Sequence, residues 1–268
     1  MENVSYIIPL NEYNKEVEER LKKALNSLDD VDGSEDDEIL FVGPQKVIEK
    51  AASLLSKKNH KEVTLVANEE KTDFFNQVNT AVFSCTTPFF SILEFDDAYK
   101  PYWNTEAQRY GTAVNASIIL PLNEYTIDGE LSSLGNEIVW SSVFAEKENE
   151  TLGFISIDTL DTFFDFNITG ALIRTEDFIS LGGLKPSLKI AAWYEFLLRA
   201  AYNKKVIYVV PKVGYEHTVQ RKGSYADTAY KTISAEEGKW LIATAKQEYF
   251  FKEDRNKIFE QETSEAEK

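Results

Sequence analysis

The chain has 268 residues, of which 43% are hydrophobic and 13% aromatic, and its formal net charge is −16. This composition is typical of a globular protein with a substantial core and excludes an intrinsically disordered chain. The negative charge argues against a nucleic-acid partner or an anionic membrane surface, because both need a basic footprint on the protein.

Cysteine usage and the first residues bear on where the protein works. Cys85 is the only cysteine, so no intrachain disulfide can form, which suits a reducing compartment. The N-terminal residues lack the basic region and apolar stretch of a signal peptide, and no run reaches the ~18 apolar residues of a membrane span. We therefore expect a soluble, cytoplasmic protein that has no membrane partner.

Strand and helix patterns alternate along the first hundred residues. Apolar strands are predicted at 4–8, 39–42, 63–66 and 89–93, with amphipathic helices between them at about 17–28, 47–55 and 74–82. The acidic stretch 29–38 is predicted to be a solvated loop. This alternation implies an α/β fold with a mostly parallel sheet covered by helices on both faces.

The pattern becomes less regular after residue 112. Strands are predicted at 118–120, 168–173 and 206–210, and the stretch 129–150 is polar and irregular. A short helix is expected before Gly182-Gly183, and another at 193–202. Ser234 and Glu237 form a plausible capping box, which predicts a long helix through about residue 259 and a charged tail beyond it.

The segment 88–97 carries the strongest functional signal. Its apolar strand delivers Glu94, Asp96 and Asp97 to a carboxyl end, which is the edge where open α/β sheets bind their ligands. Crowded carboxylates repel one another unless a cation lies among them, and oxygen ligands suit Mg²⁺ or Mn²⁺ carrying substrate phosphates. The alternative interpretation is a polar turn that ends a strand.

Three segments resemble the family 2 glycosyltransferases of the GT-A fold. Residues 5–12, Ser-Tyr-Ile-Ile-Pro-Leu-Asn-Glu, resemble the opening strand and loop that hold the nucleotide of a sugar donor. Glu94-Phe95-Asp96-Asp97 resembles the Asp-any-Asp motif that binds the donor diphosphate through a metal. Residues 167–174 and 181–184 resemble the acceptor-side strand, helix and double glycine.

The resemblance covers roughly residues 3–220 and implies both a fold and a domain organisation. The implied fold is GT-A, a central mostly parallel sheet flanked by helices, with a C-terminal helical extension. The implied parts are a nucleotide-sugar-binding half at 1–112, an acceptor-side half at 113–230, and a C-terminal helix with a charged tail at 231–268.

The resemblance also implies a role for each candidate site residue. The catalytic base would be Glu195, and Mg²⁺ or Mn²⁺ would be held by Glu94, Asp96, Asp97 and His217. Donor-binding residues would be Pro9, Leu10, Asn11, Glu12, Gly43 and Asn79. Acceptor-side residues would be Thr169, Gly170, Gly182, Gly183 and Tyr194. The apolar positions Trp193, Phe196, Leu197 and Ala200 predict a core-facing side of the helix, with Glu195 on the opposite side. From the residues alone, Glu195 could equally be a bystander on an exposed helix face, and His217 a solvated histidine.

Two functions remain open because the sequence departs from the family pattern. The strand at 39–42 ends in Gly43-Pro44-Gln45 without the acid that family members usually place there. The leading hypothesis is a metal-dependent, inverting transfer of a sugar from a nucleotide-sugar donor to an acceptor hydroxyl. The alternative is a catalytically inactive GT-A-like subunit of a larger assembly such as a phage virion, which would dock a protein partner through the C-terminal aromatics Tyr249, Phe250 and Phe251.

Overall fold

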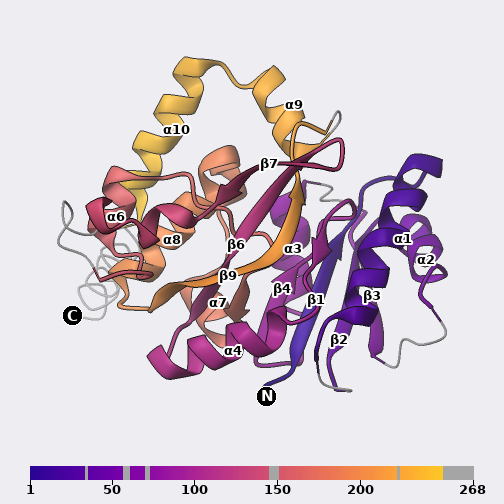
Figure 1. Ribbon diagram of the computed structural model, residues 1–268. Helices are drawn as coiled ribbons and strands as arrows, with labels where there is room; N and C mark the ends of the chain where they lie inside the picture. Colours follow the sequence, from indigo (N-terminus) through magenta and orange to yellow (C-terminus); the bar gives the residue numbers. More distant parts are fainter. Residues whose placement is uncertain (34–35, 57–60, 70–72, 145–150, 222–223, 250–268) are drawn as a thin grey trace, which may run out of the picture.

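The computed structural model describes the chain except for residues 34–35, 57–60, 70–72, 145–150, 222–223 and 250–268. One sheet runs through the molecule in the order β3-β2-β1-β4-β8-β6-β9-β5, with β7 paired to β6 (Figure 1). Its strands are β1 (Val4–Pro9), β2 (Glu38–Gly43), β3 (Glu62–Ala67), β4 (Phe89–Ile92), β5 (Ala98–Tyr99), β6 (Ile118–Ile127), β7 (Glu130–Gly135), β8 (Leu172–Arg174) and β9 (Ile207–Thr218).

Helices cover both faces of this sheet. The α-helices are α1 (Lys15–Asp30), α2 (Gln45–Ala52), α3 (Phe74–Val82), α4 (Trp103–Val114), α6 (Ile157–Thr162), α7 (Thr175–Leu181), α8 (Ala192–Tyr202), α9 (Tyr225–Thr232) and α10 (Ala235–Glu248). Two 3₁₀-helices are η1 (Glu137–Trp140) and η2 (Pro186–Ala191). The expected α/β class, with a mostly parallel curled sheet flanked by helices, is confirmed.

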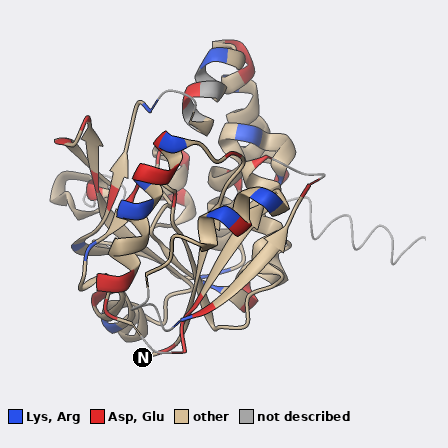
Figure 2. Cartoon of the chain, turned by 90° about the vertical axis from the view of Figure 1, so that its right-hand side faces the viewer, with Lys and Arg blue, Asp and Glu red and all other residues tan. Residues whose placement is uncertain are grey.

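Two apolar cores lie on opposite faces of the sheet. Alternate residues of β1 separate them: Ile7 packs with α3, α7 and α8, whereas Tyr6 and Ile8 pack with α1, α2 and α4. Charged residues lie mainly on the helices and loops, as Figure 2 shows. A strand buried on both faces explains why the predicted strands read as continuous apolar runs rather than alternating ones.

Strand direction explains why one edge of the sheet collects polar residues. Strands β2, β1 and β4 are parallel, so their carboxyl ends meet at the same edge. Residues 94–97 follow β4, and the short β5 then pairs antiparallel with the end of β9, with Ala98 opposite Glu216. This pairing brings residues near 217 beside residues near 97, which are 120 positions earlier in the chain.

Two predicted helix ends are confirmed by their caps. Ser234 accepts a hydrogen bond from the Glu237 N–H at the start of α10. At the start of α1, where no cap was predicted, the Asn14 side chain accepts a hydrogen bond from the Val17 N–H. Helix α7 ends at Gly182, whose φ is +88°. The described part of α10 ends at Glu248, so the predicted continuation to residue 259 lies outside the described residues.

The prediction that residues 29–38 form a solvated loop is wrong. Helix α1 extends to Asp30, and Asp37 and Glu38 are buried at 0% and 3% exposure. The Asp37 carboxylate accepts a hydrogen bond from the Val4 N–H, and the Asp32 carboxylate accepts one from the Asn104 N–H at the start of α4. These acids satisfy backbone donors, which a composition-based argument does not register.

Two further expectations need correction. The stretch predicted to be irregular after residue 129 contains β7 and η1, and the predicted strand at 118–120 continues to Ile127. Tyr249, expected to dock a partner, is 6% exposed and packs edge-on against Tyr202 with ring centroids 5.6 Å apart. Phe250 and Phe251 lie outside the described residues. Among the residues that the structure describes, no helix is long and apolar enough to span a membrane.

Candidate active site

The turn at residues 94–97 is held in place by the end of β9. The Tyr215 hydroxyl accepts a hydrogen bond from the Glu94 N–H at 3.1 Å, and the Thr218 hydroxyl donates to the Asp96 carbonyl at 2.8 Å. The Thr218 N–H donates to the Asp97 carboxylate at 2.8 Å. Three contacts from one strand therefore fix the turn that carries the acids.

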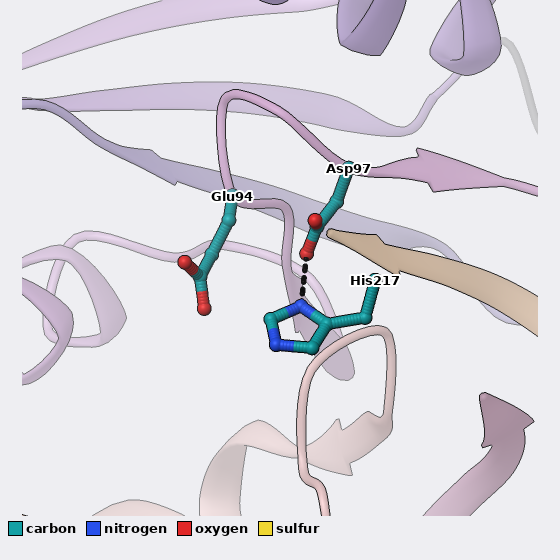
Figure 3. A group of neighbouring side chains, drawn as sticks. All are labelled: Glu94, Asp97 and His217. Atoms are coloured by element: carbon teal, nitrogen blue, oxygen red, sulfur yellow. Dashed lines mark hydrogen bonds and ion pairs between the residues drawn. The ribbon is translucent and has the colours of Figure 1, made fainter. Parts of the chain in front are cut away.

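Glu94, Asp97 and His217 form the acidic cluster at the centre of the site. Their ligand atoms, two carboxylate oxygens and a ring nitrogen, all lie within 4.8 Å of one another. Figure 3 shows the three side chains converging, with His217 Nδ1 2.8 Å from Asp97 Oδ2. Two carboxylates and an imidazole form a donor set that binds divalent cations such as Mn²⁺.

Burial shapes the protonation of this cluster. Burial raises the pKa of Asp97 and of Glu94, and their mutual charge raises the pKa of Glu94 further. Burial by itself lowers the pKa of His217, but the carboxylates of Asp97, Glu94 and Asp96 together outweigh it and raise that pKa to about 9. At neutral pH His217 is therefore an imidazolium, and a metal that binds it must displace a proton.

Asp96 lies beside the cluster, but its carboxylate is paired with arginine side chains. Its Oδ2 atom is 2.6 Å from Arg221 Nε and 3.6 Å from an Arg20 guanidinium nitrogen. The Arg221 guanidinium also lies over the Phe95 ring, 4.3 Å from the centroid. Asp96 is thus neutralised by arginines of the protein, and the three groups that converge on one point are Glu94, Asp97 and His217.

A pocket of about 410 Å³ opens next to these acids. Its walls come from the loop after β1, the start of α3, the turn after β4 and the segment after β9, and its lining residues are Pro9, Leu10, Asn11, Glu12, Asp73, Phe74, Gln77, Glu94, Phe95, Arg221 and Tyr225. The Gln77 amide donates to the Asn11 side chain at 2.6 Å, which fixes the loop. All four residues predicted at the end of β1 and in the loop after it lie on this pocket.

The other two predicted donor-binding residues lie away from the pocket lining. Gly43 lies beneath the loop, where a β-carbon would come within 1.9 Å of the Leu10 carbonyl oxygen. The Asn79 amide accepts from the Leu184 N–H at 2.8 Å and donates to the Leu184 carbonyl at 2.9 Å. Gly43 therefore allows the loop to pack closely, and Asn79 supports the turn after α7.

The predicted acceptor-side residues serve local structure in the described part of the chain. Thr169 bonds the Asn167 side chain through its hydroxyl at 2.6 Å and through its N–H at 2.8 Å. Gly182 and Gly183, with φ of +88° and +69°, form the turn that ends α7. Tyr194 is 4% exposed and donates its hydroxyl to the Leu160 carbonyl at 2.9 Å.

The orientation predicted for Glu195 is wrong. The sequence pattern turned this residue away from the core, yet it is 0% exposed. Its carboxylate is 2.7 and 2.9 Å from Arg199 nitrogens and 2.9 Å from Lys185 Nζ. The outer side of α8 is covered by α6, η2 and α10, so this helix has no solvated face for Glu195 to occupy.

Several residues of the site were missed from the sequence. Arg20, Phe74, Gln77, Arg221 and Tyr225 all contact the acids or line the pocket. Arg221 follows His217 by four residues, and this proximity to a predicted metal ligand is the signal that could have identified it. Arg20 lies on the polar face of α1, where nothing in the helical periodicity distinguishes it from neighbouring surface cations.

The arrangement defines the class of fold. A parallel block with an acid-bearing turn after its fourth strand, facing the loop after β1, is the arrangement of the GT-A fold, and the solved structures similar to this chain share that fold. Two of them are crystal structures of S. aureus TarS residues 1–349, one in complex with UDP and one in complex with UDP-GlcNAc.

The likeness to TarS is structural rather than close in sequence. The UDP complex has a TM-score of 0.60 and the UDP-GlcNAc complex one of 0.64; both are 18% identical and cover 91% of this chain. The chain spans 65% and 66% of those two structures and 43% of the TarS structure with a TM-score of 0.58. No protein-family model matches the chain, and no curated protein matches it in sequence.

Proposed function

We propose that the chain binds a nucleotide-sugar and transfers the sugar to an acceptor, with a divalent cation held by Glu94, Asp97 and His217. The observation that carries the proposal is the convergence of these three groups beside a pocket lined by the loop after β1. A nucleotide diphosphate fits the chemistry, because its leaving charge needs a metal or cationic side chains to stabilise it.

The arginines beside Asp96 support the same proposal. Arg221 lines the pocket while it is paired with Asp96, and Arg20 approaches the same carboxylate from α1. A guanidinium can exchange a carboxylate for phosphate oxygens at little cost, since it binds both through the same planar donors. Mg²⁺ or Mn²⁺ would supply Lewis-acid stabilisation of the diphosphate when bound.

Titration calorimetry with UDP-GlcNAc, with and without Mn²⁺, tests this function. We expect Mn²⁺-dependent binding in the native chain and its loss in Asp97→Asn, which preserves the shape of the side chain. Lys22→Gln, which changes an exposed cation on α1, is the matched control and should bind normally. Absence of binding across a panel of nucleotide-sugars and both metals would contradict the proposal.

The second candidate function, binding without transfer, is supported by the position of Glu195. A base must reach the acceptor hydroxyl, whereas both oxygens of this carboxylate are engaged inside the core by Arg199 and Lys185. The catalytic assignment of Glu195 remains a prediction. Glu195→Gln tests it on protein whose melting curve shows that it is folded, because loss of a base lowers turnover by roughly 10²–10⁴ at unchanged donor affinity, whereas loss of a structural ion pair lowers stability. A chain that binds the donor and shows no turnover with any acceptor would favour the binding subunit.

A further inference from the structure

Tyr215 is a buried tyrosine that connects the core to the acidic turn. It lies on β9 two residues before His217, and its side chain is 0% exposed. Its hydroxyl oxygen accepts the Glu94 N–H at 3.1 Å, the first N–H of the turn that carries the acids. The hydroxyl therefore contacts the backbone of a proposed metal ligand while the ring lies in the apolar core.

The ring of Tyr215 is held on two sides. Tyr99, its partner across the β5–β9 pairing, packs edge-on with ring centroids 5.1 Å apart. On another side lies Gly170, where a β-carbon would come within 2.4 Å of the Tyr215 ring, so only glycine leaves room for it. Gly170 has a φ of +73°, and its carbonyl accepts the indole N–H of Trp103 at 2.8 Å.

These contacts explain a glycine at position 170 without the predicted contact with an acceptor sugar. Trp103 on α4 fixes Gly170, Gly170 leaves space for the Tyr215 ring, and the Tyr215 hydroxyl fixes the Glu94 backbone. A rigidly packed hydroxyl holds a backbone group at a constant position.

We propose that Tyr215 is a positioning residue, whose hydroxyl sets the turn that presents Glu94 and Asp97 to a divalent cation. The inference rests on the proposed function, because it concerns the same metal. Tyr215 acts through the Glu94 backbone and does not itself contact the donor or the metal. Groups that orient metal ligands in this indirect way typically contribute 10- to 100-fold to metal affinity.

The test compares Tyr215→Phe with Tyr99→Phe. Both substitutions remove one hydroxyl from the same buried aromatic group, but the Tyr99 hydroxyl bonds the Ser91 hydroxyl at 2.7 Å rather than the turn. Mn²⁺ affinity is measured by titration with Mn²⁺ alone, thermal unfolding reports stability, and amide hydrogen exchange of Glu94 reports whether the turn is held.

We expect Tyr215→Phe to weaken Mn²⁺ binding by about tenfold or more and to speed exchange of the Glu94 amide. Tyr99→Phe should leave Mn²⁺ affinity within about twofold at a similar loss of melting temperature. Unchanged Mn²⁺ affinity in Tyr215→Phe, or equal losses in both variants, would overturn the inference.

Failure of the proposed function gives a different result. A native chain that binds no Mn²⁺ contradicts the metal site, and the exchange experiment then decides the role of Tyr215 by itself. Unaltered exchange of the Glu94 amide in Tyr215→Phe would show that the hydroxyl does not hold the turn.

Discussion

Two buried carboxylate clusters of this chain, one around Glu195 and one around Asp97, are neutralised by cationic side chains to different degrees. Around Glu195, one carboxylate faces two cations, Arg199 and Lys185, and Arg199 also donates to the Gly183 carbonyl at 2.7 Å. Around Asp97, two carboxylates share one imidazolium, and burial raises the pKa of both acids.

The difference separates a structural ion cluster from a binding site. A buried carboxylate whose oxygens are all paired has no capacity left for a ligand, and removing a partner from it costs stability. A cluster with more acids than cations gains free energy when a further cation arrives, which is the usual condition of a functional site. The following experiments test this contrast in order of decreasing effect.

The largest effect is expected on stability at the Glu195 cluster. Arg199→Met retains much of the buried volume but leaves Lys185 as the one cation paired with Glu195 among the described residues. The Lys185 side chain is 31% exposed. We expect a loss of about 3–5 kcal/mol in the free energy of unfolding, measured by urea denaturation. A loss below about 1 kcal/mol would show that this cluster is not structural.

At the Asp97 cluster the expected effect is on binding. Asp97→Asn removes one of two poorly neutralised acids but also the partner of the His217 imidazolium, so we expect a loss of stability that is smaller than that of Arg199→Met. Mn²⁺ affinity should fall by about 100-fold or more, measured by calorimetry. A variant that loses stability as Arg199→Met does, while still binding Mn²⁺, would reverse the proposed contrast.

Metal binding should depend on pH because His217 must lose its proton. With a pKa of about 9, the apparent Mn²⁺ association constant should rise about tenfold from pH 7 to pH 8. The stability of the metal-free protein should fall over the range of pH in which Mn²⁺ binding strengthens. The protonated, ion-paired histidine stabilises the fold fully below its ordinary value of 6.5, and this stability is lost as the pH rises through about 9. Melting curves at several pH values, with and without Mn²⁺, measure both trends.

The smallest effect is expected at Lys185. Its ammonium is partly exposed and bridges Glu195 at 2.9 Å to the Glu248 side chain at 3.3 Å. Because solvent screens this pair, Lys185→Met should cost about 1 kcal/mol or less and leave donor affinity unchanged. A loss comparable to that of Arg199→Met would mean that both cations are equally necessary to Glu195.

The sequence predicted the fold and half of the site for identifiable reasons. The strand before Glu94 is a continuous apolar run, and the strand–helix alternation fixes which ends of the strands meet, so the acidic edge follows from local pattern. His217 reaches that edge through the pairing of β9 with β5 and β6, which residue patterns do not encode. Its assignment therefore came from resemblance rather than from the residues.

Glu195 was misplaced for a specific physical reason. Apolar residues at helical spacing were taken to define one buried face, but α8 is buried all round, from Ala192 to Ala200 with Trp193 partly exposed. Arg199, four residues after Glu195, is the signal that could have corrected this, since an acid and a base at that spacing pair along a helix.

The pairing of Asp96 with Arg20 and Arg221 has a consequence for association kinetics. The three acids Glu94, Asp96 and Asp97 are balanced by these two arginines and the His217 imidazolium, so these six groups together exert little long-range field. Glu12 and Asp73 on the pocket lining add negative charge to them. The rest of the chain brings the net charge to −16 and repels an anionic nucleotide-sugar at a distance. Added salt screens that repulsion, so the donor should associate faster as ionic strength rises.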